Sequence, residues 1–306
     1  MSDKIVQVHH LVKRYGNFTA VHDLSFEVYR GEVFGLLGPN GAGKTTTIRI
    51  IMDILKPDGT GVQGARKATV SIFGHPPRTV RARVGYLPEE RGLYRNMMVL
   101  SVLEYLAQLK GLGRTTARQN AITWLEKVGL RDWAGRKVSE LSRGMQQKLQ
   151  LAASAVHDPE LLILDEPFQG LDPVNVEAIK GLIHDLQRDG KTIVLSAHQM
   201  NLVEALCDRI LLVNKGRGVL YGKLADIKRQ YAPNSIRLRT SAALPDLAGV
   251  KQVRALGNGT YTLTLEGISS QGLLKSLVDH GLPIESYEVA TAPLDEIFIA
   301  AVKGDR

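Results

Sequence analysis

The stretch Gly38-Pro39-Asn40-Gly41-Ala42-Gly43-Lys44-Thr45, followed by Thr46, decides the fold class of this chain. It matches the pattern G-x-x-x-x-G-K-[ST]. A short apolar run at residues 32–37 precedes it, and residues 44–55 read as a helix. Glycines let backbone N–H groups converge on phosphate oxygens where a helix begins, and the helix dipole favours anions there. The sequence therefore predicts a phosphate-binding loop, with Lys44 reaching the β- and γ-phosphates and the Thr45 hydroxyl on Mg²⁺.

A pair of acidic residues follows, and its first member lies 121 residues after Lys44. Residues 161–164 form an apolar run that leads into Asp165 and Glu166. Asp165 is placed to hold Mg²⁺ through water, and Glu166 to orient and polarise the attacking water in phosphoryl transfer. Acidic residues also cap strand ends in α/β proteins, so the pair alone leaves a structural role equally open. Taken with the loop at 38–45, it favours nucleotide hydrolysis.

The order of apolar runs predicts a doubly wound α/β core. Residues 161–164 and 192–195 are typical of parallel strands buried on both faces, and residues 174–187 between them have helical spacing. Residues 5–12 and 24–29 alternate as half-buried strands do.

Two further regions complete the expected organisation. We expect a first domain at residues 1–230 with a helical insertion at about 97–157, where Ser101 and Glu104 form a capping-box pattern. A small α+β domain at residues 235–306 follows. Its expected elements are a strand at 235–240, a hairpin of 253–256 and 260–265 joined at Asn258-Gly259, a helix at 269–280, a strand at 284–289 and a helix from Leu294.

Composition bounds the class of protein. The chain has 306 residues, a length that suits a large and a smaller domain, and one cysteine, Cys207, which excludes an internal disulfide framework. No apolar run approaches the roughly 18 residues of a spanning helix, and the start lacks the apolar segment of a secretion signal. We therefore expect a soluble, cytosolic protein. The net charge of +8 is scattered, so it does not choose among phosphate, nucleic acid and membrane as partners.

Further motifs identify the family that the chain resembles. Leu141-Ser142-Arg143-Gly144-Met145-Gln146-Gln147 resembles the Leu-Ser-Gly-Gly-Gln signature of ATP-binding cassette (ABC) proteins. Gly170-Leu171-Asp172-Pro173 is similar to the D-loop, Ser196-Ala197-His198 to the switch histidine, and Tyr86-Leu87-Pro88-Glu89-Glu90 to the Q-loop. Taken alone, each of Tyr15, Ser142 and His198 is better explained by an ordinary structural role. The occurrence of all these motifs in the family's order is not explained in that way. The resemblance implies a P-loop NTPase ABC cassette with an antiparallel β subdomain and a helical insertion.

The resemblance also implies ligands and roles. ATP and Mg²⁺ are the expected ligands, held in a head-to-tail homodimer in which Ser142 and Gly144 face the γ-phosphate of the other protomer. His198 is implied to contact the γ-phosphate and to hold the water near Glu166, and Asp172 to link the two sites. The residues implied to bind nucleotide are Tyr15 and Val21 at the adenine, Gly38, Pro39, Asn40, Gly41, Ala42, Gly43, Lys44, Thr45, Thr46, Glu89, Ser142, Gly144 and Asp172; the implied catalytic residues are Glu166, His198 and Lys44, and the implied Mg²⁺ ligands are Thr45, Glu89 and Asp165.

Departures from the family pattern point to a subgroup. Glu89 stands where a glutamine is usual, and an ionised carboxylate accepts hydrogen bonds but cannot donate them. Arg143 and Met145 replace a common Gly and Gln; Arg143 adds a cation near the partner's phosphates or points to solvent. Residues 59–67 form an extra stretch, expected to be a surface hairpin. Residues 87–94, the signature at 142–147 and a small C-terminal domain that ends Pro293-Leu294-Asp295-Glu296-Ile297-Phe298 together resemble the ATP-binding subunits of type-2 ABC exporters, of the antibiotic-resistance and sodium-export kind.

The expected function is an ATP-hydrolysing subunit that drives export through a separate integral membrane permease, on the cytoplasmic face of the cell membrane. Residues 89–95 and 97–106 are the expected permease contact. The alternative is a soluble ABC ATPase acting on nucleic acid or ribosomes. Such proteins usually carry two cassettes or a long insertion, whereas 98 residues separate Lys44 from Ser142 and residues 235–306 carry a net charge of −1, so no nucleic acid is expected. A GTPase is excluded because Asn214-Lys215-Gly216-Arg217 lacks the aspartate that reads guanine.

Overall fold

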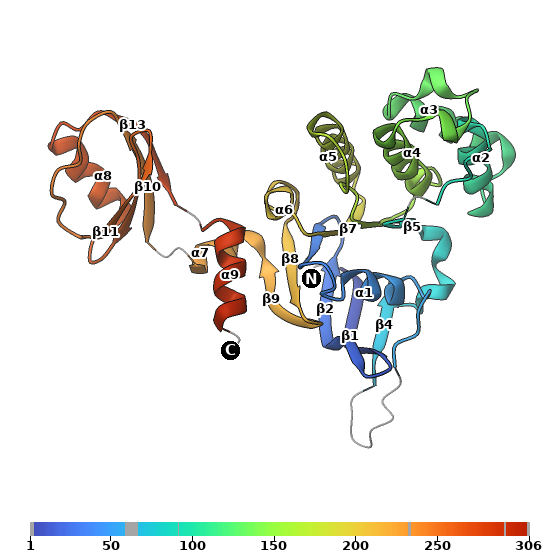
Figure 1. Ribbon diagram of the computed structural model, residues 1–306, viewed down its shortest axis with the longest axis horizontal. Helices are drawn as coiled ribbons and strands as arrows, with labels where there is room; N and C mark the ends of the chain where they lie inside the picture. Colours follow the sequence, from blue (N-terminus) through green and yellow to red (C-terminus); the bar gives the residue numbers. More distant parts are fainter. Residues whose placement is uncertain (1–2, 59–66, 91, 232–233, 291, 305–306) are drawn as a thin grey trace. The chain divides into compact units, whose positions relative to one another are not determined.

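The computed structural model describes residues 3–58, 67–90, 92–231, 234–290 and 292–304 (Figure 1). The chain divides into two compact units, and the boundary lies between Lys223 and Leu224. The segment at 224–230, which we expected to end the first domain, therefore groups with the second unit. The hairpin expected at 59–67 lies outside the described residues, apart from its last residue.

A six-stranded sheet forms the centre of the first unit. Its order is β5-β6-β7-β3-β8-β9; β9 runs antiparallel to β8 and the other pairs are parallel. Every residue of β3, β6 and β7 is buried, as expected of strands covered on both faces. The strands are β3 (Val33–Leu37), β5 (Val84–Leu87), β6 (Leu161–Asp165), β7 (Thr192–Ala197), β8 (Arg209–Asn214) and β9 (Arg217–Lys223).

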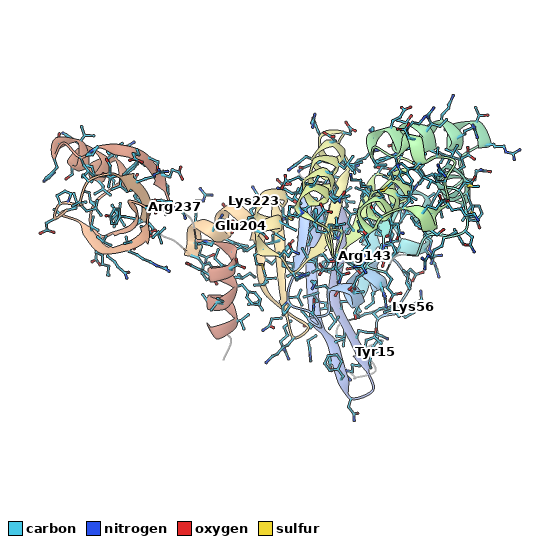
Figure 2. All side chains as sticks on the ribbon, turned by 45° about the horizontal axis from the view of Figure 1, so that its top comes forward. Tyr15, Lys56, Arg143, Glu204, Lys223 and Arg237 are labelled. Atoms are coloured by element: carbon cyan, nitrogen blue, oxygen red, sulfur yellow. The ribbon has the colours of Figure 1, made fainter. Side chains whose placement is uncertain are left out.

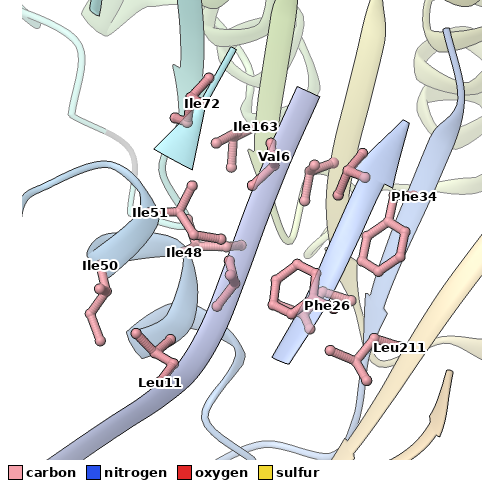
Figure 3. Close-up of a cluster of buried hydrophobic side chains, with 14 of the residues drawn as sticks. Val6, Leu11, Phe26, Phe34, Ile48, Ile50, Ile51, Ile72, Ile163 and Leu211 are labelled. Atoms are coloured by element: carbon pink, nitrogen blue, oxygen red, sulfur yellow. The ribbon is translucent and has the colours of Figure 1, made fainter. Parts of the chain in front are cut away.

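A three-stranded antiparallel sheet, in the order β2-β1-β4, packs over the central sheet through a shared core (Figure 3). Its strands are β1 (Lys4–Tyr15), β2 (Phe18–Tyr29) and β4 (Thr69–Ile72). Phe26 of β2 stacks on Phe34 of β3 with ring centroids 5.5 Å apart. Ile48 and Ile51 of α1 (Lys44–Ile51) are fully buried in the same cluster. Each such side chain contributes about 1.5–3 kcal/mol, so the core fixes the helix that begins at Lys44.

Helix α1 ends four residues earlier than expected. Asp53 adopts a left-handed backbone conformation (φ 57°), and the N–H groups of Ile54 and Leu55 both donate to the carbonyl of Arg49. This closing turn satisfies the last carbonyls of the helix. An apolar residue at position 55 suggested continuation, but the turn at Asp53 ends the helix first.

The expected helical insertion is a group of helices beside the central sheet, drawn in green in Figure 1. It consists of α2 (Val99–Leu109), α3 (Arg114–Lys127), η3 (Arg131–Trp133), η4 (Val138–Glu140) and α4 (Arg143–Ala155). The capping box expected at Ser101 is wrong, because α2 already begins at Val99. The N–H groups of Val99 and Leu100 donate to the carbonyls of Arg136 and Ala134, so a distant turn satisfies the start of the helix.

Further helices of the first unit are α5 (Pro173–Arg188), α6 (Met200–Leu206), η1 (Pro77–Thr79) and η2 (Arg81–Arg83). Among the described residues of the whole chain, none of the helices combines the length and apolar character needed to cross a membrane.

The second unit contains an antiparallel sheet in the order β11-β12-β10-β13. Its elements are α7 (Leu224–Tyr231), β10 (Ser235–Thr240), β11 (Val250–Gly257), β12 (Thr260–Leu265), α8 (Ser270–Asp279), β13 (Ile284–Val289) and α9 (Leu294–Gly304). Asn258 and Gly259 both have positive φ (50° and 69°), so the predicted hairpin turn is present. Leu273 and Leu277 of α8 are fully buried in this unit's own core.

His157, directly after α4, makes folding stability depend on pH. Its Nε2 donates to the carbonyl of Val84 at 3.2 Å, and burial lowers the pKa of the imidazole from 6.5 to about 4. The unfolded chain therefore binds a proton first as the pH falls. We expect the His157 contribution to be fully present above pH 6.5 and to be lost between pH 6.5 and 4, by about 3 kcal/mol. Urea unfolding of His157→Gln across this range should show a flatter pH profile than the parent, and an identical profile would contradict the assignment.

Candidate functional site

The loop between β3 and α1 requires glycine at two positions. At Gly38 (φ 152°) an added Cβ would overlap the carbonyl oxygen of Val213, and at Gly43 (φ 103°) it would lie 2.5 Å from the carbonyl oxygen of Ala20. A side chain at either position would displace the loop from β2 or β8. Gly43 also caps α1, whose first residue is Lys44. The loop backbone is therefore held against two strands with the start of α1 directed at the site.

Lys44 is a buried cation at the centre of the site. Its Nζ donates to the carbonyls of Gly38 and Pro39 at 2.8 and 3.3 Å and lies 3.2 Å from Glu166 Oε1. Glu166 Oε1 has no hydrogen-bond partner among the described residues, so its contact with Lys44 is an ion pair rather than an aligned hydrogen bond. With 6% and 8% of their side chains exposed, Lys44 and Glu166 are largely removed from water.

Asp165 lies at the end of β6 and is fully buried. Its Oδ1 accepts from the hydroxyls of Ser196 at 2.6 Å and Thr45 at 3.3 Å, whereas its Oδ2 has no hydrogen-bond partner in the part of the chain that the structure describes. Burial raises the pKa of Asp165, against the two hydroxyl bonds, which lower it. Asp165 thus presents a buried oxygen with an unused lone pair.

Glu166 and His198 form a second contact beside Asp165. Glu166 Oε2 lies 2.9 Å from His198 Nδ1, and the Glu166 N–H donates to the Ser196 hydroxyl at 2.8 Å. Glu166 has a left-handed backbone (φ 50°), which costs a non-glycine residue roughly 1–3 kcal/mol. Strain of this kind gathers at functional sites. The turn directs the Glu166 carboxylate toward both Lys44 and His198.

A cavity of about 260 Å³ opens over the loop. It is lined by Tyr15, Phe18, Ala20, Asn40, Gly41, Ala42, Gly43, Lys44, Thr45, Thr46, Glu89 and Glu166. Tyr15 lies at the tip of the β1–β2 hairpin, half exposed (Figure 2). Val21 differs from the expectation: it is fully buried in the core, and its neighbour Ala20 lines the cavity instead.

The signature and D-loop residues do not line this cavity of the single chain. Ser142 caps α4 by accepting from the Met145 N–H at 3.3 Å, and Asp172 caps α5 by accepting from the Asn175 N–H at 3.0 Å. That bond lowers the pKa of Asp172. The Asn175 side chain lies against Gly144, where any Cβ would overlap it. The two caps are therefore neighbours, joined through Asn175.

Arg143 follows the Ser142 cap as the first residue of α4. It lines a second cavity with Arg95 and Gln146, and Figure 2 shows it well away from Tyr15.

Helix α4 reaches both loops beside the cavity. The buried Gln147 side chain donates to the carbonyl of Pro167 at 2.9 Å, and the buried Gln150 side chain donates to the carbonyls of Pro88 and Glu90, both at 3.2 Å. One helix thus holds the chain after Glu166 and the chain around Glu89.

Besides Ala20, three residues of the site were given no role from the sequence: Phe18, Ser196 and Gln169. Phe18 is the cross-strand partner of Tyr15, so an aromatic residue three positions after Tyr15 was the available signal. Ser196 pairs in register with Asp165 on the adjacent strand, and its hydroxyl joins Asp165 to the Glu166 backbone. Gln169 donates to Glu89 Oε1 at 3.4 Å. The last two contacts depend on which segments are neighbours in space, and the sequence offered no direct sign of them.

Comparisons with known proteins agree with this geometry. The ABC transporter family profile matches residues 21–169, and a profile described as the C-terminal domain of DrrA1-3-like ATP-binding proteins matches residues 222–302. The chain is 35% identical to the Nod factor export ATP-binding protein I of Ralstonia nicotianae over 308 residues, which cover 97% of this chain and 94% of that protein. It is 32% identical to the daunorubicin resistance ATP-binding protein DrrA3 of Streptomyces coeruleorubidus over 320 residues, which cover 100% and 98%.

A solved structure shows the same fold. The ATP-binding subunit of an ABC transporter superposes with a TM-score of 0.66 at 31% identity, over 74% of this chain and 93% of the other. The expected P-loop ABC fold is therefore confirmed, as is the resemblance to ATP-binding proteins of antibiotic resistance and export. The chain belongs to the family of ABC transporter ATP-binding proteins, and it is an ATPase of that family.

Proposed function

We propose that this ATPase powers export of a substrate through a separate membrane permease, to which it binds on the cytoplasmic face of the membrane. The observation that carries the proposal is similarity over nearly the whole chain, both units included, to a Nod factor export protein and to a drug-resistance protein. A soluble ABC ATPase that acts on nucleic acid or ribosomes is not favoured, because the relatives whose names state a process are named for export or drug resistance.

The roles proposed for the site residues follow from their positions. The loop N–H groups and Lys44 bind the phosphates of ATP, because α1 begins there and Lys44 Nζ lies beside the cavity. Glu166 orients and deprotonates the attacking water, and His198 holds Glu166 by the contact at 2.9 Å. Tyr15, with Phe18 beside it, offers an aromatic face to the adenine.

Mg²⁺ fits the oxygen atoms that Thr45 of α1, Glu89 after β5 and Asp165 at the end of β6 bring together. Thr45 Oγ1 lies 3.3 Å from Asp165 Oδ1 and 3.4 Å from Glu89 Oε2, and Asp165 Oδ2 keeps an unused lone pair. Hydroxyl and carboxylate oxygens, completed by water and phosphate, are the ligands that Mg²⁺ prefers. We propose that Thr45, Glu89 and Asp165 hold the ion, which would neutralise charge on the phosphates.

We propose that two copies of the chain close head to tail around two ATP molecules. Ser142 and Gly144 stand at the start of α4, outside the cavity of their own chain, so a second copy would bring them to the γ-phosphate. Asp172, beside them, would then reach the partner's site.

The groove beside the Q-loop is the proposed permease contact. It has a volume of about 360 Å³ and is lined by the apolar side chains of Met52, Tyr86, Leu93, Leu106 and Leu109, among others. The exposed rings of Tyr94 and Tyr105, which adjoin the lining residues Leu93 and Leu106 in the chain, pack edge to face with centroids 5.6 Å apart. An apolar groove with exposed aromatic rings is typical of a protein interface.

The deciding experiment is affinity capture of the tagged chain from detergent-solubilised native membranes, with and without ATP. A polytopic membrane protein in stoichiometric amount would support the proposal, and its sequence would narrow the substrate. Recovery of ribosomal or DNA-repair proteins without a membrane partner would overturn the export function and leave the ATPase chemistry intact.

Charge placed in the groove should break the permease contact. Leu109 is 62% exposed at the end of α2, and Val278 is 60% exposed on α8 of the second unit. We expect Leu109→Glu to lower recovery of the permease at least about tenfold, because burying an unpaired carboxylate is costly, while ATP affinity of the purified chain is unchanged. Val278→Glu is the matched control. Equal recovery with Leu109→Glu and the parent would exclude the groove.

A further inference from the structure

We infer that Gln169 is a positioning residue for Glu89, and that the two side chains act together in place of the glutamine usual in the Q-loop. The inference rests on the proposed nucleotide site. It concerns a residue to which neither the motifs nor the family match gives a role.

The hydrogen bonds of Glu89 show why a second residue is needed. The Thr45 hydroxyl lies within reach of two carboxylates, 3.4 Å from Glu89 Oε2 and 3.3 Å from Asp165 Oδ1. A hydroxyl has one hydrogen, so it can donate to only one of them at a time. Gln169 Nε2 supplies another donor, to Glu89 Oε1 at 3.4 Å. Gln169 therefore holds the Glu89 carboxylate when the Thr45 hydrogen is directed at Asp165.

The two side chains meet because both loops are anchored to α4. The Gln169 N–H donates to the carbonyl of Glu166 at 3.1 Å, which closes the turn after β6, and Gln147 holds the carbonyl of Pro167 within that turn. On the opposite side Gln150 holds the carbonyls that flank Glu89. The buried amides of Gln147 and Gln150 thus fix the backbone of the two loops that carry Gln169 and Glu89, so the two side chains face each other.

The pair restores the chemistry that Glu89 alone lacks. A glutamine presents one acceptor and one donor group on a single side chain, whereas an ionised glutamate presents acceptors only. Here Glu89 provides the acceptor toward Thr45 and Gln169 provides the carboxamide. After bonding to Glu89, which lines the cavity, Gln169 keeps a second N–H and a carbonyl oxygen for water.

The test is a double-mutant cycle on these two residues. The variants are Gln169→Glu, Glu89→Gln and the exchange Glu89→Gln with Gln169→Glu; Gln108→Glu, the same change on the exposed face of α2, is the control. The readout is equilibrium binding of a fluorescent ATP analogue, in excess Mg²⁺ and in EDTA, followed by single-turnover hydrolysis.

Gln169→Glu opposes two carboxylates beside the phosphates, so we expect affinity in Mg²⁺ to fall at least about tenfold. The exchange variant should recover to within about threefold of the parent, because the donor and the acceptor face each other again. If the fold-changes in affinity of the two single variants simply multiply in the double variant, the two residues act independently and the inference is overturned. Failure of the parent itself to bind the analogue would instead overturn the proposed site.

Discussion

Glu166→Gln should bind ATP with the affinity of the parent and hydrolyse it about 10³-fold more slowly, because a general base contributes roughly 10²–10⁴-fold. Glu166 Oε2 lies 2.9 Å from His198 Nδ1, and its Oε1 lies 3.2 Å from Lys44 Nζ. An amide of the same shape keeps an acceptor toward either neighbour but cannot take a proton from water. The proposed dimer, once closed on ATP, should then persist. Steady-state hydrolysis, nucleotide binding and light scattering with ATP measure the three effects.

Glu177→Gln is the matched control for that experiment, since Glu177 lies exposed on α5 and pairs only with Lys180 at 2.8 Å among the described residues. It should hydrolyse ATP at the parental rate. If Glu166→Gln did so too, another group would have to be the base, and Glu166 would keep only a structural role through its contacts with Lys44 and His198.

Lys44→Ala should lower ATP affinity at least about 100-fold, because hydrogen bonds to a charged group are each worth about 1.5–3 kcal/mol and tenfold in affinity is about 1.4 kcal/mol. In the described structure Lys44 Nζ is held by the carbonyls of Gly38 and Pro39, at the rim of the phosphate loop. The same change leaves Glu166 buried without its counter-charge. Fluorescent nucleotide titration measures the affinity, and thermal unfolding the stability.

Lys180→Ala is the matched control, because it removes the charge and the packing of a half-buried lysine on α5 outside the site. Parental ATP affinity in Lys44→Ala, with Lys180→Ala also unchanged, would contradict the proposed role of the loop. A lower melting temperature in Lys44→Ala alone would show that the buried pair also stabilises the fold.

Motifs that depend on local geometry could be predicted from the sequence. The loop at 38–45 requires glycines at fixed positions before a helix, and the turn at Asn258-Gly259 requires two residues with positive φ. The positions of Asp165 and Glu166 followed from an apolar run of strand length. These features are set by residues close to one another in the chain, so a single sequence is enough to show their patterns.

Features that depend on contacts between residues far apart in the chain could not be predicted from the sequence. Irregular pairing in β1, between Leu11 and Arg14, breaks the alternation along the hairpin. The family resemblance implied Val21 at the adenine, but Val21 is buried and Ala20 lines the cavity. The start of α2 is set by carbonyls at 134 and 136, and α7 groups with α9 of the second unit. Gln169 meets Glu89 across 80 residues of sequence. Such contacts follow from packing, which a single sequence does not display.

Asn175 has a consequence for timing in the proposed dimer. Its side chain lies against Gly144 at the start of α4 and bonds Asp172 at the start of α5, so the two helix starts are in contact within one chain. In the proposed head-to-tail dimer, the start of α4 would face the nucleotide bound by the partner. The start of α5 carries Asp172, which would reach the partner's site. A shift of α4 on release of phosphate at one site would then be transmitted through Asn175 to the other site. Hydrolysis at the two sites would be coupled rather than independent.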